Sequence, residues 1–395
     1  MLNDPIVIAA VARTPMGGFN GVLKPFSAPE LGDTVIRAAV ERAGLKPEQI
    51  EEVIMGCVLP AGQGQAPARQ AALGAGLPLS TGCTTINKMC GSGMKAAMFA
   101  HDLLAAGTND FMVAGGMESM TNAPYLLPKA RGGYRMGHHQ VIDHMFFDGL
   151  EDAYEKGRLM GSFAEDCASS YQFTREEQDR FAIASLERAQ AANKQGWFAW
   201  ETAPIAIKAG KDEQFIEADE QPFKANFEKI PTLKPAFRKD GTVTAANSSS
   251  ISDGAAALVM MRRSTAERHG LATLALIHGH STHAQAPALF TTAPVGAIKK
   301  LYAATGWTDR DVDLYEINEA FAVVTMAAMQ EHKLSHAKVN IHGGACALGH
   351  PIGASGARII VTLIGALRKT GGKRGIASLC IGGGEATAMA IELTQ

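Results

Sequence analysis

Cys90 is the residue of this chain whose surroundings best fit a catalytic nucleophile. It follows the apolar segment CTTIN and precedes a helical pattern that begins near Ser92, with glycines at 91 and 93. A thiol at a helix N-terminus lies at the positive end of the helix dipole, which favours the reactive thiolate. Most cysteines are instead small, buried and unreactive, so the local pattern alone leaves both interpretations open.

His350 is the candidate base for this thiol. It lies in the glycine-rich segment GGACALGHPIGASG, directly before a second helical pattern. Pro351 disfavours helical backbone at His350, which predicts that the histidine lies in a loop. Such a histidine can accept the proton of a neighbouring thiol, as in the Cys–His pairs of covalent catalysis. The alternative is an ordinary loop histidine that hydrogen-bonds to backbone.

Cys380 and Asn318 are two further candidates, each at the end of an apolar strand pattern. Cys380 precedes the glycines at 382–384, whose backbone N–H groups could stabilise an oxyanion. Asn318 precedes the helical pattern AFAVVTMAAMQEH and could orient a water molecule or a substrate carbonyl. Each also has an ordinary structural interpretation, a core-strand cysteine for Cys380 and a helix N-cap for Asn318.

The elements that would position these residues occur twice along the chain. In each copy, residues 92–118 and residues 355–385, a Ser-Gly pair precedes a helical pattern and then an apolar strand ending in glycines and a glutamate. Upstream, Ala-Pro at 28–29 and at 293–294 begins another helical pattern. We infer an internal duplication of an α/β unit with a mixed, largely parallel sheet. Packing of the copies about a pseudo-twofold axis would bring the loops before the two helices to one face.

Residues 121–249 interrupt this alternation and are interpreted as an insertion in the first copy. They contain irregular stretches and one clear helical pattern, with a capping box that starts at Thr174 and Gly196 at the C-terminal end. An insertion of this length is more often functional than decorative, and we expect it to cover the active site. The predicted division is an N-terminal half of residues 1–120 plus about 250–272, the insertion of residues 121–249, and a C-terminal half of residues 273–395.

The composition fits a globular protein of two or three domains and excludes several classes. The chain has 395 residues, of which 46% are hydrophobic and 19% charged, with a formal net charge of −2. This charge creates no field that would attract nucleic acid, and no apolar stretch approaches the ~18 residues of a membrane span. The segment MLNDPIVIAAVARTP predicts a buried strand rather than a secretion signal. Six cysteines without CxxC pairs predict reduced thiols and a cytoplasmic location.

A protease triad, a zinc site and a dinucleotide site are not supported by the candidate residues. Cysteine, histidine and asparagine also form a protease triad, but a triad would leave the second cysteine unused. Zinc ligands recur at close spacing, which the histidines and cysteines between 342 and 380 lack, so no metal site is predicted. The glycines at 115–116 and 382–384 do not form GxGxxG, so no dinucleotide cofactor is predicted.

Several segments, in order along nearly the whole chain, resemble the thiolase family, the acetyl-CoA acetyltransferases and 3-ketoacyl-CoA thiolases. The segments are IVIAAVARTPMGGF, MGCVLPAGQGQAPARQAA, INKMCGSGMKA, VAGGMESM, DGTVTAANSSSISDGAAA, NEAFA, GGACALGHPIGASGAR and CIGGGEA. The resemblance implies the thiolase fold, in which two α/β half-units pack as five layers, α-β-α-β-α, with a loop domain inserted in the first. It also implies an acyl-CoA C-acyltransferase that condenses two acyl-CoA molecules or cleaves a 3-ketoacyl-CoA with CoA.

The resemblance further implies a role for each candidate residue. Cys90 corresponds to the acylated nucleophile and His350 to the base that activates it. Cys380 corresponds to the acid/base that exchanges a proton with the α-carbon of the second acyl-CoA. Asn318 would hold a catalytic water that forms one oxyanion hole with His350, and the N–H groups of Cys90 and Gly382 would form the other. Acyl transfer through Cys90 would then follow a two-step, ping-pong course.

Coenzyme A and acyl-CoA thioesters would bind as substrates, with no permanently bound cofactor. The residues that match family positions near these substrates are Met160, Phe237, Ser249, Ala320 and Phe321. Departures from the family pattern at Leu159, Ser250 and Phe290 leave the acyl-chain preference open. The likeness also implies a role in fatty acid metabolism and a homodimer or homotetramer, with residues 131–139 as an assembly loop.

Two alternatives are weighed against a thiolase. A decarboxylating ketoacyl synthase of the same superfamily would prefer a second histidine near Asn318 and would not need Cys380. A non-catalytic lipid-binding protein on the same fold would be free to lose its nucleophile or its base. This chain retains Cys90, His350 and Cys380 in their full motifs, which favours the thiolase.

Overall fold

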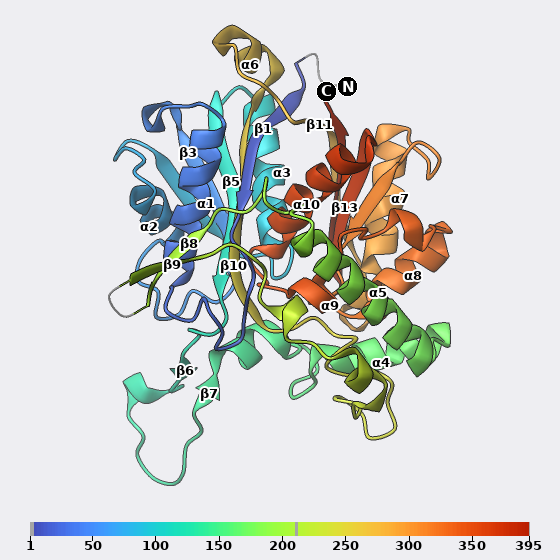
Figure 1. Ribbon diagram of the computed structural model, residues 1–395. Helices are drawn as coiled ribbons and strands as arrows, with labels where there is room; N and C mark the ends of the chain where they lie inside the picture. The colour runs from blue at the N-terminus through green and yellow to red at the C-terminus, as the bar shows by residue number, and fades with distance from the viewer. Residues whose placement is uncertain (1–3, 210–211, 395) are drawn as a thin grey trace.

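The computed structural model describes residues 4–209 and 212–394, and a ten-stranded sheet forms its centre. The strand order is β12-β13-β14-β11-β1-β10-β5-β3-β4, and the short β2 (Gly17–Gly18) pairs with β10. Strands β1 and β11 meet through two residue pairs, Val7 with Leu276 and Ile8 with Ala275. The sheet is therefore two half-sheets joined at a narrow seam, as Figure 1 shows.

Each half-sheet belongs to one half of the chain. The elements of the first half are β1 (Ile6–Arg13), α1 (Ala28–Arg42), β3 (Glu52–Gly56), α2 (Pro67–Gly74), β4 (Gly82–Ile86), α3 (Ser92–Ala105), β5 (Phe111–Ser119), β10 (Ser252–Arg262) and α6 (Arg263–His269). Those of the second half are β11 (Ala275–Ala284), α7 (Ala293–Thr305), β12 (Leu314–Ile317), α8 (Ala322–His332), α9 (Ala345–Leu348), α10 (Ser355–Thr370), β13 (Arg374–Ile381) and β14 (Glu385–Leu393). The predicted N-terminal strand is confirmed as β1.

The two half-sheets have the same internal order, which confirms the duplication. In the first, β3 runs parallel to β4 and β5, while β5 and β1 both pair antiparallel with β10. In the second, β12 runs parallel to β13, while β13 and β11 both pair antiparallel with β14. A parallel bridge between Tyr315 and Val339 takes the place of β4.

The expectation of a largely parallel sheet is wrong, because antiparallel pairs predominate. In each half the last strand, β10 or β14, runs back between the first strand and the parallel strands. A strand placed there must oppose both of its neighbours. The strand–helix–strand pattern in the sequence correctly indicates parallel pairs, but it does not reveal the antiparallel return of β10 and β14.

Buried side chains fill the spaces between five layers, which confirms the α-β-α-β-α arrangement. One group fills the space between the first half-sheet and α1 and α2, and another lies between the second half-sheet and α7 and α8. The central group joins both half-sheets to α3 and α10. Helix α10 is buried on every side along Ser355–Leu367, as expected of a helix enclosed between two sheets.

Glycines let the two central helices approach through their backbones. A Cβ atom on Gly93 would lie 2.8 Å from the backbone nitrogen of Ala357, and one on Gly356 would collide with the backbone of Met94. The contact is reciprocal, because each glycine lies in the first turn of its helix. It places the loops that precede α3 and α10 beside one another.

Among its described residues the insertion holds two α-helices, of which the sequence pattern revealed one. Helix α5 (Arg175–Lys194) begins with the predicted capping box at Thr174, whose side chain accepts a hydrogen bond from the Glu177 backbone N–H. Helix α4 (Met160–Tyr171) was not predicted. The insertion also contains two antiparallel strand pairs: β6 (Tyr125–Leu126) with β7 (Ile142–Asp143), and β8 (Ile205–Ala209) with β9 (Asp212–Ile216).

A buried ion-pair cluster ties the insertion to the first half. The fully buried Arg13 guanidinium lies 2.5 Å from a carboxylate oxygen of Glu201 and 2.7 Å from one of Asp219. Asp219 also accepts a hydrogen bond from the Met16 backbone N–H. Removing one partner would leave an uncompensated buried charge, so these side chains fix the path of the insertion across β1.

Residues 127–141 between β6 and β7 form a loop that projects away from the rest of the molecule (Figure 1). The side chains of Leu127, Met136 and Val141 are exposed in it. Among the described residues, no helix combines the length and apolar character needed to cross a bilayer.

The backbone contact between the central helices predicts that Gly93→Ala destabilises the fold. The added methyl would overlap backbone atoms, which cannot rotate away, and such overpacking costs about 1–3 kcal/mol. Gly279→Ala is the matched control, since a Cβ there meets its nearest atoms, side-chain methyls, at 3.5 and 3.8 Å. Urea unfolding of the two variants checks the prediction, and equal midpoints would contradict it.

Candidate active site

One cavity of about 370 Å³ collects the catalytic candidates from both halves of the chain. Cys90, His350, Cys380 and Gly382 all line it. The first half supplies the loop before α3, and the second supplies the loop before α10 and the turn after β13. The insertion contributes further wall residues through α4 and the segment around Phe237.

The loop before α3 holds Cys90 at the start of that helix, as predicted. Met89 adopts a positive φ of 46°, and its carbonyl accepts a hydrogen bond from the Ser92 backbone N–H. The Ser92 hydroxyl in turn accepts one from the Lys88 backbone N–H at 2.8 Å. Lys88 also pairs at 2.5 Å with Glu385, which follows the turn of Gly382, so an ion pair links the two loops.

The resting thiol of Cys90 is protonated at neutral pH. Burial raises its pKa to about 11, and the backbone N–H groups of Gly382 and of Cys90 itself oppose this without reversing it. The expectation that the helix dipole makes the thiol unusually acidic is therefore wrong for the free enzyme. Loss of water around the sulfur outweighs the favourable dipoles.

His350 is a neutral imidazole held in a defined orientation. Burial lowers its pKa to about 3, with a further contribution from the positive charge of Arg358. Its backbone N–H donates a hydrogen bond to the Ser250 carbonyl. A buried neutral histidine can act as a base only through whichever ring nitrogen lacks a proton, so the tautomer decides its function.

Ser355 selects that tautomer. Its Oγ lies 2.5 Å from Nδ1 of His350 and 2.9 Å from the Pro351 carbonyl oxygen. A hydroxyl has one proton, so both contacts are hydrogen bonds only when Ser355 donates to the carbonyl and accepts from Nδ1–H. Nε2 is then unprotonated, and the amide nitrogen of Asn318 lies 3.5 Å from it as a donor. Ser355 was not singled out in the sequence, although it stands five residues after His350 in the same motif.

Asn318 contacts His350 and is not one of the residues that line the cavity. Helix α8 begins four residues later with Phe321 as its N-cap, so the N-cap interpretation of Asn318 is wrong. The side chain is buried, and its Oδ1 has no hydrogen-bond partner among the residues described. A buried carbonyl oxygen without a partner is available to a water molecule or a substrate group.

Cys380 is the next-to-last residue of β13 and lines the same cavity. Burial raises its pKa well above the ordinary value, and the nearby Cys90 sulfur adds to this because two thiolates would repel each other. Gly383 and Gly384 have φ values of 93° and 87°, which non-glycine residues rarely adopt. This tight turn directs the Gly382 N–H toward the Cys90 sulfur.

Two buried glutamates, not recognised in the sequence, brace the loops around the cavity. Glu118 accepts hydrogen bonds from the backbone N–H groups of Val58, Leu59 and Gly353, at 2.8–3.0 Å. Burial raises the pKa of Glu118 to about 7. The second is Glu319, whose hydrogen-bond partners are Ser185, Asn340 and the Cys346 backbone N–H. Glu118 lies near the end of β5 and Glu319 follows β12, and these positions at strand ends were the signals available in the sequence.

Aromatic side chains form part of the cavity wall. The Phe321 ring lies 6.0 Å from the Phe237 ring and 6.5 Å from the Phe290 ring, measured between centroids, with edge-on geometry. The remaining residues expected near the substrate, Met160, Ser249 and Ala320, line the cavity as well. Ser249 is fixed through its backbone N–H, which donates to the Ala320 carbonyl at 3.0 Å.

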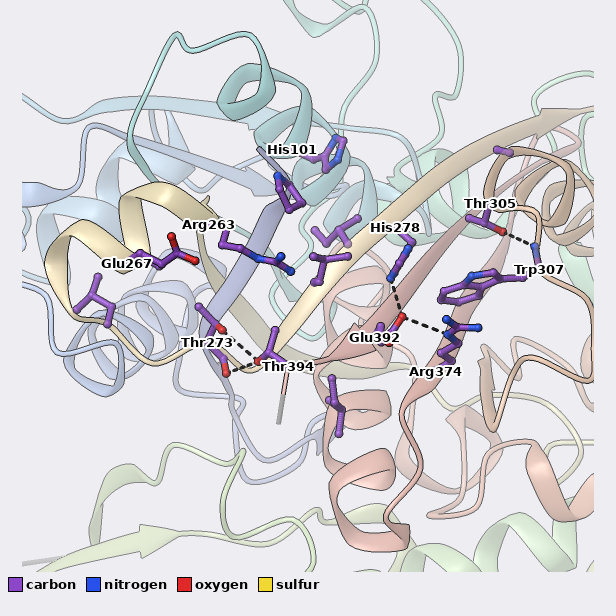
Figure 2. Close-up of a pocket in the computed structure, with 17 residues that line it drawn as sticks. His101, Arg263, Glu267, Thr273, His278, Thr305, Trp307, Arg374, Glu392 and Thr394 are labelled. Atoms are coloured by element: carbon purple, nitrogen blue, oxygen red, sulfur yellow. Dashed lines mark hydrogen bonds and ion pairs between the residues drawn. The ribbon is translucent and has the colours of Figure 1, made fainter. Parts of the chain in front are cut away.

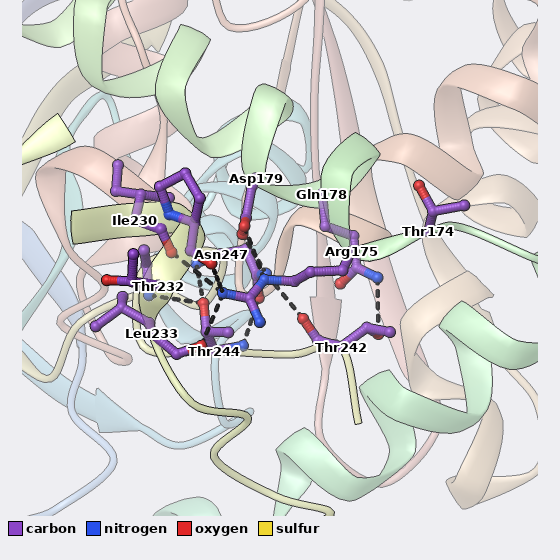
Figure 3. A network of polar contacts seen from close by, with 12 residues as sticks. Thr174, Arg175, Gln178, Asp179, Ile230, Thr232, Leu233, Thr242, Thr244 and Asn247 are labelled. Carbon is purple, nitrogen blue, oxygen red and sulfur yellow. Dashed lines mark hydrogen bonds and ion pairs between the residues drawn. The ribbon is translucent and has the colours of Figure 1, made fainter. Parts of the chain in front are cut away.

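A polar network joins helix α5 to the segment that carries Ser249, at the end of the insertion (Figure 3). Arg175 lies 2.7 Å from Asp179 and donates to the backbone carbonyls of Ile230 and Leu233. Asp179 accepts a hydrogen bond at 3.1 Å from Asn247. Helix α5 thus positions the chain two residues before Ser249.

The whole chain matches known families and proteins. Residues 6–264 match the family described as Thiolase, N-terminal domain, and residues 271–393 match Thiolase, C-terminal domain. Acetyl-CoA acetyltransferase 2 of Arabidopsis thaliana is 50% identical over 98% of this chain and 97% of its own length. Acetyl-CoA acetyltransferase of Cupriavidus necator is 49% identical over 98% and 99%.

Solved structures of two proteins from the same family superpose closely on this chain. The Bacillus anthracis acetyl-CoA acetyltransferase superposes with a TM-score of 0.96 at 41% identity, covering 99% of each chain. The Ascaris suum Acat5 thiolase in complex with coenzyme A gives a TM-score of 0.94 at 41% identity, covering 98% of this chain and 100% of its own. The chain belongs to the thiolase family and is an acyl-CoA C-acyltransferase.

The contacts of Ser355 predict that Ser355→Ala slows acylation of the enzyme. The His350 ring N–H would lose its buried acceptor, which costs about 1–3 kcal/mol and corresponds to roughly a 10- to 100-fold lower rate. Ser378→Ala is the control, because it removes a comparable buried hydrogen bond, to the Thr387 carbonyl, without touching His350. Single-turnover acylation measures both variants, and equal rates would refute the assigned tautomer.

The raised pKa of Cys90 predicts how alkylation depends on pH. A pKa near 11 leaves the thiol protonated below that pH, so the thiolate fraction should rise about tenfold for each pH unit. We therefore expect iodoacetamide labelling of Cys90, followed by peptide mass spectrometry, to accelerate from pH 6 to at least about pH 9. A plateau near pH 7 would instead indicate a preformed thiolate–imidazolium pair.

Proposed function

We propose that this enzyme transfers acetyl groups between coenzyme A thioesters, condensing two acetyl-CoA molecules or cleaving acetoacetyl-CoA with CoA. The observation that carries the proposal is the convergence of two sulfurs and one neutral imidazole on a single cavity. The names of the relatives support the acetyl group. The cavity volume of about 370 Å³ also lies near the lower end of ordinary ligand pockets, which fits a short acyl chain.

In the first half-reaction, Cys90 attacks the thioester carbonyl of the first substrate. His350 Nε2 takes the thiol proton as the carbon–sulfur bond forms, then gives it to the departing CoA sulfur. The N–H groups of Cys90 and Gly382 hold the oxyanion of the tetrahedral intermediate, and one such donor is worth about 3–4 kcal/mol. The product is an acetyl group on Cys90.

In the second half-reaction, the Cys380 thiol gives its proton to Nε2 of His350, and the resulting thiolate removes a proton from the α-carbon of the second acetyl-CoA. The enolate oxygen is stabilised by the Nε2–H of His350 and by a water molecule held at Asn318. The carbanion attacks the acetyl-enzyme, Cys90 leaves as a thiolate, and His350 returns its Nε2 proton to Cys90. The raised pKa of Cys380 suits this role, because a more basic thiolate is a stronger base toward carbon.

The family resemblance also supports assignments of the substrate contacts and of the domain organisation. Met160, Phe237, Ser249, Ala320 and Phe321 would contact the pantetheine arm and the acyl group, and coenzyme A would bind only as a substrate. The insertion of residues 121–249 would act as the cap between the N-terminal half, residues 1–120 with 250–272, and the C-terminal half, residues 273–395.

The assembly we propose is a homodimer or homotetramer. Strand β4 is the outer strand of its half-sheet and is only partly buried, and an exposed sheet edge is a common surface for pairing with a second copy. The projecting loop around 131–139 would serve a tetramer contact. The six free thiols fit a reducing compartment such as the cytoplasm, and a role in fatty acid metabolism follows from the reaction.

The two half-reactions can be separated by variants. Cys90→Ser should abolish the acetyl-enzyme adduct in intact-mass spectrometry. Cys380→Ser should keep acylation within about tenfold but lower condensation by more than about 100-fold, because only the second step needs a base at carbon. Cys83→Ser, which changes a thiol on β4 away from the cavity, is the control.

Two outcomes would overturn the assignment. A normal acetyl adduct on the Cys90→Ser variant would show that Cys90 is not the nucleophile. Equal loss of both half-reactions in the Cys380→Ser variant would show that Cys380 has no separate role in condensation. Thiolysis rates with acetoacetyl-CoA and longer 3-ketoacyl-CoA substrates test the acyl preference. Turnover with none of these substrates would favour a binding protein.

A further inference from the structure

Two histidines and an aspartate gather where helix α3 meets strand β11, outside the catalytic cavity. Nδ1 of His101 and Nε2 of His280 each lie 2.9 Å from the same carboxylate oxygen of Asp102, and 3.3 Å from one another. The two imidazole rings are perpendicular, with centroids 4.8 Å apart. Three atoms that can each donate a lone pair therefore converge on one point.

We propose that His101, Asp102 and His280 form a binding site for a divalent transition-metal ion of the zinc class. Two imidazoles and one carboxylate are a ligand set that zinc, cobalt and nickel accept, and solvent would complete the coordination. Sequence spacing does not indicate this set, because its members come from residues 101–102 and 280, far apart in the chain. It is unrelated to the histidines and cysteines between 342 and 380.

The distances suit an ion with little rearrangement. Ligand atoms at zinc bond lengths around a tetrahedral ion lie about 3.3 Å from one another. The His101–His280 separation already has this value, and the two contacts with Asp102 must lengthen by about 0.4 Å, which a side-chain rotation supplies. The backbone of α3 and β11 can stay in place.

The two imidazoles can offer their converging nitrogens to an ion. A ring nitrogen that binds a metal carries no proton, so on binding the ring protons would occupy His101 Nε2 and His280 Nδ1. Lys95 lies close enough to oppose the ion through its charge.

Solvent can reach the cluster. His101 forms part of the wall of a groove of about 1200 Å³ that runs along β11 toward Trp307 and Arg374 (Figure 2). The Asp102 side chain is 57% exposed, whereas those of His101 and His280 are 12% and 17% exposed. Two sheltered ligands and one open ligand leave room for coordinated water.

An ion at this position would connect the two halves of the chain. His101 and Asp102 belong to the first half, and His280 belongs to the second. Binding to the native state alone stabilises the fold by mass action. Catalysis need not change, since His101 lies nine residues along α3 from Ser92, roughly 14 Å at the helical rise.

Metal binding by the tag-free, chelator-treated full-length protein tests the proposal. Equilibrium dialysis against Zn²⁺ and Co²⁺ should show one ion per chain that His280→Ala and Asp102→Asn bind at least about tenfold more weakly. His278→Ala is the matched control, because this histidine lies two residues away on β11 and pairs with Glu392 instead. The control should bind like the parent.

Spectroscopy and stability separate this site from the thiols. The Co²⁺ form should lack the charge-transfer absorption of thiolate ligands, and Zn²⁺ should raise the melting temperature of the parent and His278→Ala but not of His280→Ala. Equal affinity in parent and His280→Ala, or a thiolate spectrum, would overturn the proposal. So would a Zn²⁺ stabilisation that persists without His280.

Discussion

The backbone contact between the central helices is the constraint on which this molecule depends. Where α3 and α10 begin, Gly93 and Gly356 allow one backbone to lie against the other, and no larger residue fits there without displacing main chain. This contact sets the loops of Cys90 and His350 side by side. The Lys88–Glu385 ion pair and the Glu118 carboxylate then hold the surrounding loops around one cavity.

Burial, rather than a strong local charge, governs the electrostatics of the site. It lowers the pKa of His350 and raises those of Cys90 and Cys380, so all three groups rest in their neutral forms. Negative charge then develops only during the reaction, on the oxygen of the tetrahedral intermediate, where fixed backbone N–H groups can donate hydrogen bonds to it. Such preorganised donors act strongly because little water competes with them.

The sequence was most informative where local pattern and motif coincided. It predicted Cys90 before a helix, His350 in a loop, the capping box at Thr174 and the duplicated order of elements. It failed where the outcome depends on neighbours that are distant in the chain. The direction of β10 and β14, the buried environment that makes Cys90 a weak acid, and the hydrogen bond from Ser355 to Pro351 belong to this class. Helix α4 was missed because it has a leucine instead of a polar residue at its N-cap and a glycine in its first turn.

The neutral resting state also bears on the durability of the enzyme. Peroxide and similar oxidants attack thiolates far faster than thiols, and a low pKa is what makes most regulatory cysteines vulnerable. Because burial keeps the protons on both sulfurs, the unloaded enzyme presents little oxidisable thiolate to the cell. Sulfur becomes reactive chiefly once a thioester occupies the cavity, so the feature that delays chemistry until substrate arrives also protects the enzyme between turnovers.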